Sequence, residues 1–128
     1  TAALASNFFL GQGPWTPWQM LAWGLVGASG GWVGRLFPRA GTGTLAALGI
    51  IWGYLFGVIM NLWNWLAYVY PLTLTTFLAV EATGIWFDTM HAGGNALMAL
   101  FLTKRLLPRL VRFRERLYFE VVREVNLD

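Results

Sequence analysis

The chain has 128 residues, of which 57% are apolar and only 12% charged, and its formal net charge is +3. This charged share is far below the roughly 25% of an ordinary soluble domain and, with a mean hydropathy of +0.55, it indicates a membrane protein. The absence of cysteine excludes disulfides, thiolate metal sites and cysteine nucleophiles.

The N-terminal end of the chain is apolar and is followed by the turn sequence GQGPWTPW. We expect residues 1–10 to be the tail of a helix that begins before Thr1. Pro14 and Pro17 stop a helix that enters from the N-terminal side, and we expect Thr16 to cap the next helix.

Three further segments have the length of about 20 residues that a bilayer requires. They are expected at 18–37, 43–65 and 75–103, and the third is long enough to tilt or to kink near Gly93-Gly94. The sequence therefore predicts an all-α fold, a polytopic transmembrane bundle of three full spans plus the tail of a preceding helix. We assign residues 1–107 to this transmembrane domain and 108–128 to a cytoplasmic amphipathic segment.

Basic residues predict the orientation of the spans. Arg35 and Arg39 mark one loop, and seven of the nine Lys and Arg residues follow Thr103. The positive-inside rule places both regions in the cytoplasm, with the tryptophan-rich loops outside.

Glycines recur at helical spacing on the first two spans, which predicts close helix packing, chiefly within the chain. The positions are Gly27 with Gly31, Gly30 with Gly34, and the ladder Gly49, Gly53 and Gly57.

The C-terminal segment is amphipathic. Its apolar face is Leu106, Leu110, Phe113, Leu117 and Val121, and its basic face is Arg105, Arg109, Arg112 and Arg116. Such a helix suits the headgroup region of an anionic leaflet, and docking onto a cytosolic partner is the alternative. We expect no nucleic-acid binding, because topology accounts for nearly all of the basic residues.

The segment EATGIWFDTMHAGGN places polar residues within the third span. At helical spacing Glu81, Asp88, His91 and Asn95 fall on one face, together with Gly84. A charge within a membrane helix costs roughly 2.5–3.5 kcal/mol on insertion scales, so we interpret this face as a polar site. Two roles stay open for it, contact with a ligand and hydrogen bonding to neighbouring spans.

Several kinds of chemistry are open to these residues. His91 could ligate a haem or a chlorophyll magnesium, as in an accessory subunit of a redox or light-harvesting complex. A proton path through Glu81, Asp88 and His91 is a further alternative. No serine triad or phosphate loop is recognisable, and we expect no enzyme activity, cofactor or metal in this chain alone.

The outer loops form a second candidate surface, with aromatic rings beside neutral amides. This chemistry suits a pocket for a ring-bearing organic molecule, and an aromatic interface belt is the alternative. The residues are Trp15, Trp18, Trp63, Trp65, Tyr68 and Tyr70, with Gln12, Gln19, Asn61 and Asn64.

Two strings, SNFFLGQGPWTPWQMLAWGLVGASGG and IWFDTMHAGGNALMALF, resemble the substrate-binding membrane subunit (S component) of energy-coupling factor (ECF) vitamin transporters. The resemblance covers about Ser6 to Leu107. Members usually have six spans and bind a vitamin or similar micronutrient from outside. They work with a membrane coupling subunit and two ATPase subunits.

The resemblance implies a multi-pass protein of a bacterial inner (plasma) membrane whose three spans are helices four to six. It also implies where the substrate binds. The implied substrate-binding residues are Trp15, Thr16, Trp18, Asn61, Trp63, Asn64, Asp88, His91 and Asn95. The first two helices of the family have no counterpart in this sequence.

Overall fold

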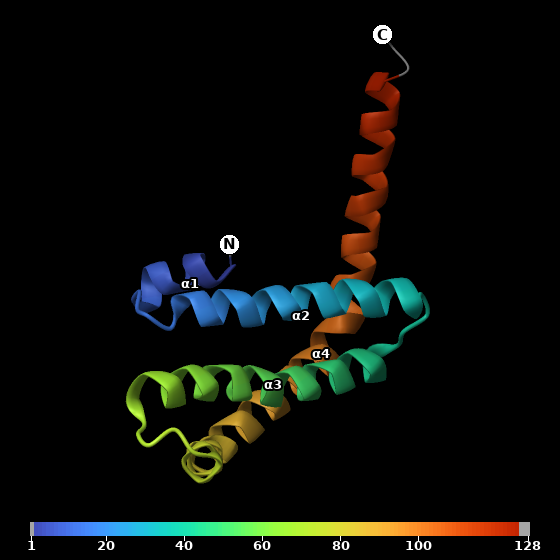
Figure 1. The fold of residues 1–128 in the computed structure, drawn as a ribbon. Coiled ribbons are helices and arrows are strands. Elements are labelled where there is room, and N and C mark those ends of the chain that lie inside the picture. Colours follow the sequence, from blue (N-terminus) through green and yellow to red (C-terminus); the bar gives the residue numbers. More distant parts are fainter. Residues whose placement is uncertain (1, 126–128) are drawn as a thin grey trace.

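The computed structural model describes the backbone of residues 2–125 and the side chains of residues 2–9 and 11–116. This part of the chain is all-α, as predicted, and consists of α1 (Ala2–Leu10), α2 (Thr16–Leu36), α3 (Thr42–Tyr68) and α4 (Leu74–Val125). In Figure 1, α2 and α3 run antiparallel, α1 folds back along α2, and α4 crosses behind α3. The three expected spans coincide with α2, α3 and the first part of α4.

Local interactions fix the ends of these helices. Gly11 follows α1 with φ of 97°, a left-handed conformation that glycine adopts readily, and its N–H donates to the Asn7 carbonyl at 2.9 Å. The expectation that Thr16 caps α2 is wrong. Trp15 occupies the cap position without a side-chain bond, because the Thr16 hydroxyl bonds to Gln12 and Asn7 instead. At α4, the Thr76 N–H donates to the Thr73 hydroxyl at 3.3 Å, which caps the first turn.

The distribution of side chains reverses that of a soluble domain. Among the described side chains, the buried apolar residues are all alanines, and the buried polar residues are Asn7, Thr16 and Asp88. Large apolar side chains such as Phe8, Trp32 and Phe101 lie on the exterior. An apolar exterior of this extent requires an apolar environment or a partner, and small residues between helices are typical of packing in lipid.

Among the described residues, α3 is the one helix that is long and apolar enough to cross a membrane, with a mean hydropathy of 1.9 in its most apolar part. The mean hydropathy of α2 is lower than that of α3 because the glycines and tryptophans of α2 contribute little to it. The mean hydropathy of α4 is lower because α4 contains the polar face. This result is compatible with a membrane location. The other two spans and the orientation remain predictions.

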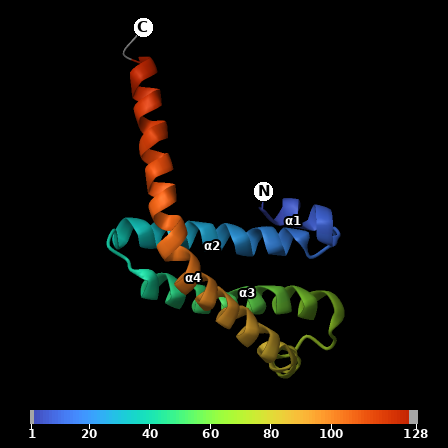
Figure 2. The same ribbon diagram turned by 180° about the vertical axis from the view of Figure 1, so that it is seen from behind.

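Helix α4 continues through the expected boundary at residue 108, with Pro108 inside it. Figures 1 and 2 show a change of direction in its orange part, beyond which the red C-terminal part runs across the axes of α2 and α3. We attribute the bend to Pro108, because proline lacks the N–H that would bond to the preceding turn. The sequence predicts that this span tilts or kinks near Gly93-Gly94. The side chains of Leu117 and Val121 lie outside the described residues.

Candidate functional site

The polar face of α4 lies against α3 along a contact that we call the α3–α4 seam, formed by Gly49, Gly53 and Gly57 with Asn95, Ala92 and Asp88. The Asn95 amide donates to the Gly49 carbonyl at 3.2 Å. A methyl group added at Gly53 would overlap backbone atoms of Ala92, and one at Gly57 would overlap the Asp88 carboxylate. The predicted single polar face is therefore confirmed, and the glycines make room for it.

The end of the seam nearest the loop between α3 and α4 joins an amide to a carboxylate. The Asn61 amide donates to Glu81 Oε2 at 3.4 Å and also lies beside Gly84, where an added Cβ would be 2.8 Å from Asn61 Nδ2. The second carboxylate oxygen of Glu81 is buried, and no described residue bonds to it. Asn61 and Glu81 thus link α3 to α4.

Asp88 is only 4% exposed and fills the space that Gly57 leaves open. It and Glu81 are seven residues apart on one helix, which corresponds to about 10 Å of rise. This separation is too long for direct proton transfer between the two carboxylates. The geometry therefore gives Asp88 and Glu81 a role in packing α4 on α3.

A cavity of about 270 Å³ lies between α2, α3 and α4, and His91 and Asn95 are part of its wall. Three aromatic residues, Trp23, Trp52 and Phe56, contribute most of the ring surface. The other lining residues are Val26, Gly30, Leu45, Leu48 and Gly49. Aromatic faces together with a few polar groups are the usual wall of a small-molecule site.

Edge-to-face contacts and one hydrogen bond hold the aromatic wall in place. The Phe56 ring lies 5.4 Å from the His91 ring and 6.4 Å from the Trp23 ring. The Trp52 indole donates to the Ser29 hydroxyl at 2.6 Å, which joins α3 to α2. These rings are therefore positioned before any ligand arrives.

His91 has one unsatisfied group. Its Nδ1 atom is buried, and none of the described residues bonds to it. Leaving a buried polar atom unpaired costs about 1–3 kcal/mol, and such atoms call for an explanation such as a function or a bound water. His91 thus has a buried ring nitrogen in the cavity wall whose hydrogen-bonding capacity is unused among the described residues.

The structure distributes the other predicted site residues over different contacts. Trp15 and Trp63 meet edge to face with ring centroids 6.2 Å apart. Thr16 belongs to a polar contact between α1 and α2, where the Asn7 amide donates to its hydroxyl at 3.1 Å. Trp18 and Asn64 are half-buried and do not line the cavity.

Sequence analysis did not select the aromatic wall of the cavity. The signal for it lies in the glycine ladder, since Trp52 precedes Gly53 and Phe56 precedes Gly57. A large ring beside a glycine in close helix contact lies at the edge of that contact, where the helices begin to diverge. Trp23 can be identified as a cavity residue only when the position of α2 relative to α3 is known.

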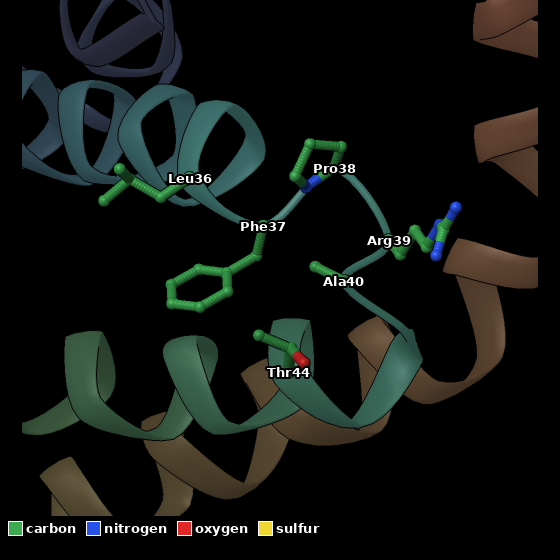
Figure 3. A pocket seen from close by; sticks show the side chains of 6 residues that line it. All are labelled: Leu36, Phe37, Pro38, Arg39, Ala40 and Thr44. Atoms are coloured by element: carbon green, nitrogen blue, oxygen red, sulfur yellow. The ribbon is translucent and has the colours of Figure 1, made fainter.

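A larger cavity, of about 760 Å³, lies at the loop between α2 and α3. Figure 3 shows that the Phe37 ring and Thr44 lie on one side of it, while the Arg39 side chain points away from them. Only Arg39 and Thr44 offer polar side chains here, and they do not converge. We therefore take the smaller cavity, with His91 and Asn95, as the candidate site.

Comparisons with protein-family models, with curated proteins and with solved structures found no match for this chain.

Proposed function

We propose that this chain is the membrane-embedded substrate-binding component of an ECF-type importer, which captures a vitamin or similar micronutrient from outside the cell. The observation that carries this proposal is the cavity lined by the aromatic residues Trp23, Trp52 and Phe56 and by the polar residues His91 and Asn95. The aromatic residues offer surface to a ring-bearing molecule, and the two polar residues offer it hydrogen bonds.

The size of the cavity narrows the class of ligand. At about 270 Å³ it lies just below the range of about 300–1,000 Å³ that drug-sized ligands occupy. A compact ring compound fits such a space better than a tetrapyrrole does. This favours a micronutrient over the haem or chlorophyll that His91 alone could ligate.

The arrangement of charge supports three spans with a cytoplasmic C-terminus. Arg35 and Arg39 lie at the end where α2 joins α3, and the contact of Trp15 with Trp63 involves the opposite ends of these two helices. The apolar exterior supports a multi-pass location in a bacterial plasma membrane. A coupling membrane subunit and two ATPase subunits follow from the resemblance to S components.

The proposal is tested by gentle purification from the native membrane, followed by mass spectrometry of the proteins and small molecules that co-purify. We expect a compact ring compound, a membrane coupling subunit and ATPase subunits. Recovery of redox subunits, with a visible absorption band from a pigment or haem, would instead identify an accessory subunit of such a complex.

Variants then locate the ligand. Trp23→Leu and Asn95→Ala should each weaken retention of the recovered compound several-fold, since a lost hydrogen bond costs about 1 kcal/mol and a lost ring contact a similar amount. Trp86→Leu is the matched control, because Trp86 lies on the exterior of α4 and is 71% exposed. Equal retention by the Trp23 and Trp86 variants would place the ligand outside this cavity.

A further inference from the structure

The C-terminal part of α4 concentrates positive charge on one strip of its surface. Residues 104–116 contain six basic side chains and a single acidic one, Glu115. At about 100° per residue, Arg105, Arg109, Arg112 and Arg116 fall within a sector of about 60°. Leu106, Leu110 and Phe113 occupy the adjoining sector and are exposed. This part of the helix is thus basic on one flank and apolar beside it.

A small cavity lies where the two sectors meet. It has a volume of about 260 Å³ and is lined by Arg109, Arg112, Phe113 and Arg116. Three of its four lining residues are arginines, and no acidic residue lines it. Planar guanidinium groups bind phosphate oxygens with paired hydrogen bonds, so the chemistry of this cavity selects a phosphate group with an apolar group beside it.

The direction of the helix fits the surface of a bilayer. In both ribbon views the red part of α4 lies beyond α2 and points away from α3, at a steep angle to the axes of α2 and α3 and nearer the end that carries their connecting loop. If α2 and α3 cross a membrane, this part lies along its surface. The centre of the apolar sector is about 100° from the centre of the basic strip, so the arginines stand at headgroup depth when the leucines face the acyl chains.

We propose that Arg109, Arg112, Arg116 and Phe113 form a binding site for the phosphate of an anionic phospholipid and hold the C-terminal part of α4 flat on the membrane. The apolar sector beside the arginines favours a lipid over an acidic protein, because a lipid supplies acyl chains next to its phosphate. This site depends on the membrane location of the chain and not on the small molecule bound between α2, α3 and α4.

The absence of cysteine from this sequence permits a direct test with single cysteine labels. A fluorescent label is attached to Leu110→Cys, in the apolar sector, or to Glu115→Cys, on the far side. The protein is placed in vesicles of phosphatidylcholine with or without phosphatidylglycerol, and quenching by aqueous iodide is measured. We expect phosphatidylglycerol to protect the label at 110 several-fold and to leave the label at 115 accessible.

Charge variants identify the residues responsible. Neutralising Arg109, Arg112 and Arg116 together to Gln should abolish the protection and lower retention of phosphatidylglycerol in native mass spectrometry at least about 100-fold, because each charge-assisted hydrogen bond to the phosphate is worth roughly tenfold or more. The matched control neutralises Lys104, Arg105 and Arg114, which do not line the cavity. This variant should keep most of the protection at position 110 and most of the retention of phosphatidylglycerol. Circular dichroism verifies that each triple variant is helical.

Three outcomes would overturn this site. Equal quenching at position 110 with and without phosphatidylglycerol would show that anionic lipid does not hold the helix. Equal losses in the two triple variants would show a diffuse attraction without a defined site. Protection that requires an added soluble protein would assign the surface to a partner. Retention of the small molecule by Arg109→Gln/Arg112→Gln/Arg116→Gln, measured in parallel, keeps this test separate from that of the proposed function.

Discussion

Two helices of this protein carry glycines at the same spacing, yet their surroundings differ. On α3, Gly49, Gly53 and Gly57 are covered by α4, close enough that an added methyl group would meet it at all three positions. On α2, no atom of another described helix lies within 4 Å of a methyl group added at Gly27 or Gly31. A glycine stripe thus permits close approach but does not determine which helix approaches.

The difference arises from what the neighbouring helix offers. Opposite the glycines of α3, α4 presents short or polar side chains, namely Asp88, Ala92 and Asn95, that fill the space the glycines leave. No described helix presents such a set to Gly27 and Gly31 on α2. The expectation that the glycines pack within the chain is therefore confirmed for α3 and wrong for this face of α2.

The largest loss of stability is expected from a substitution at Gly53, on the stripe that α4 covers. In Gly53→Val, the new side chain meets backbone atoms of Ala92, which cannot move without displacing α4. We expect a loss near the upper end of the roughly 1–3 kcal/mol that overpacking costs, measured by unfolding in mixed detergent micelles. Gly31→Val is the control, with the same side chain in an open position. Equal destabilisation of the two variants would contradict the different surroundings of these glycines.

The sequence predicted the helices better than their contacts. Pro14, Pro38 and Pro71 mark the three connections, so the expected spans agree with α2, α3 and the start of α4. The third expected span and the amphipathic segment form one continuous helix, because Pro108 removes only a single hydrogen bond from it.

The candidate site was predicted in part. The spacing of Asp88, His91 and Asn95 put them on one face, which depends only on the geometry of a single helix. The partners of that face depend on how α2 and α3 rotate about their axes, and apolar side chains occur all around both helices. The cavity residues Trp23, Trp52 and Phe56 were therefore hidden from analysis of each helix by itself.

A second prediction concerns the hydrogen bond across the seam. Asn95→Ala removes the bond to the Gly49 carbonyl, and Asn95→Asp also replaces the donor by an oxygen. We expect about 1 kcal/mol of destabilisation for Ala and more for Asp, measured by the same unfolding method. Met98→Ala, on the exposed side of α4, should change stability less than either. If Asn95→Ala and the wild type unfold at the same composition of the mixed detergent micelles, the seam does not need this bond.

A third prediction addresses the weaker link between α2 and α3. Trp52→Phe and Ser29→Ala each remove the hydrogen bond between the indole and the hydroxyl, and each should cost about 0.5–1.5 kcal/mol. If the bond forms in the folded protein, the double variant loses less than the sum of the two single losses. Strict additivity in this cycle would mean that the two side chains act separately and that α2 is held by apolar contacts alone.

The smallest effect is expected when a single methyl group is added to a glycine. The resulting change in stability should have opposite signs on the two glycine stripes. Gly31→Ala adds a methyl group in open space and gains helix propensity, which is worth up to about 1 kcal/mol in water, so its stability should equal or exceed that of the parent. Gly53→Ala gains the same propensity, but its methyl group overlaps Ala92, so it should be less stable. Both are compared by unfolding at several protein concentrations. A loss of stability in Gly31→Ala that depends on protein concentration would reveal that a second copy of the chain covers α2. The two stripes would then differ in their partner, which is α4 of the same chain for α3 and a second copy for α2.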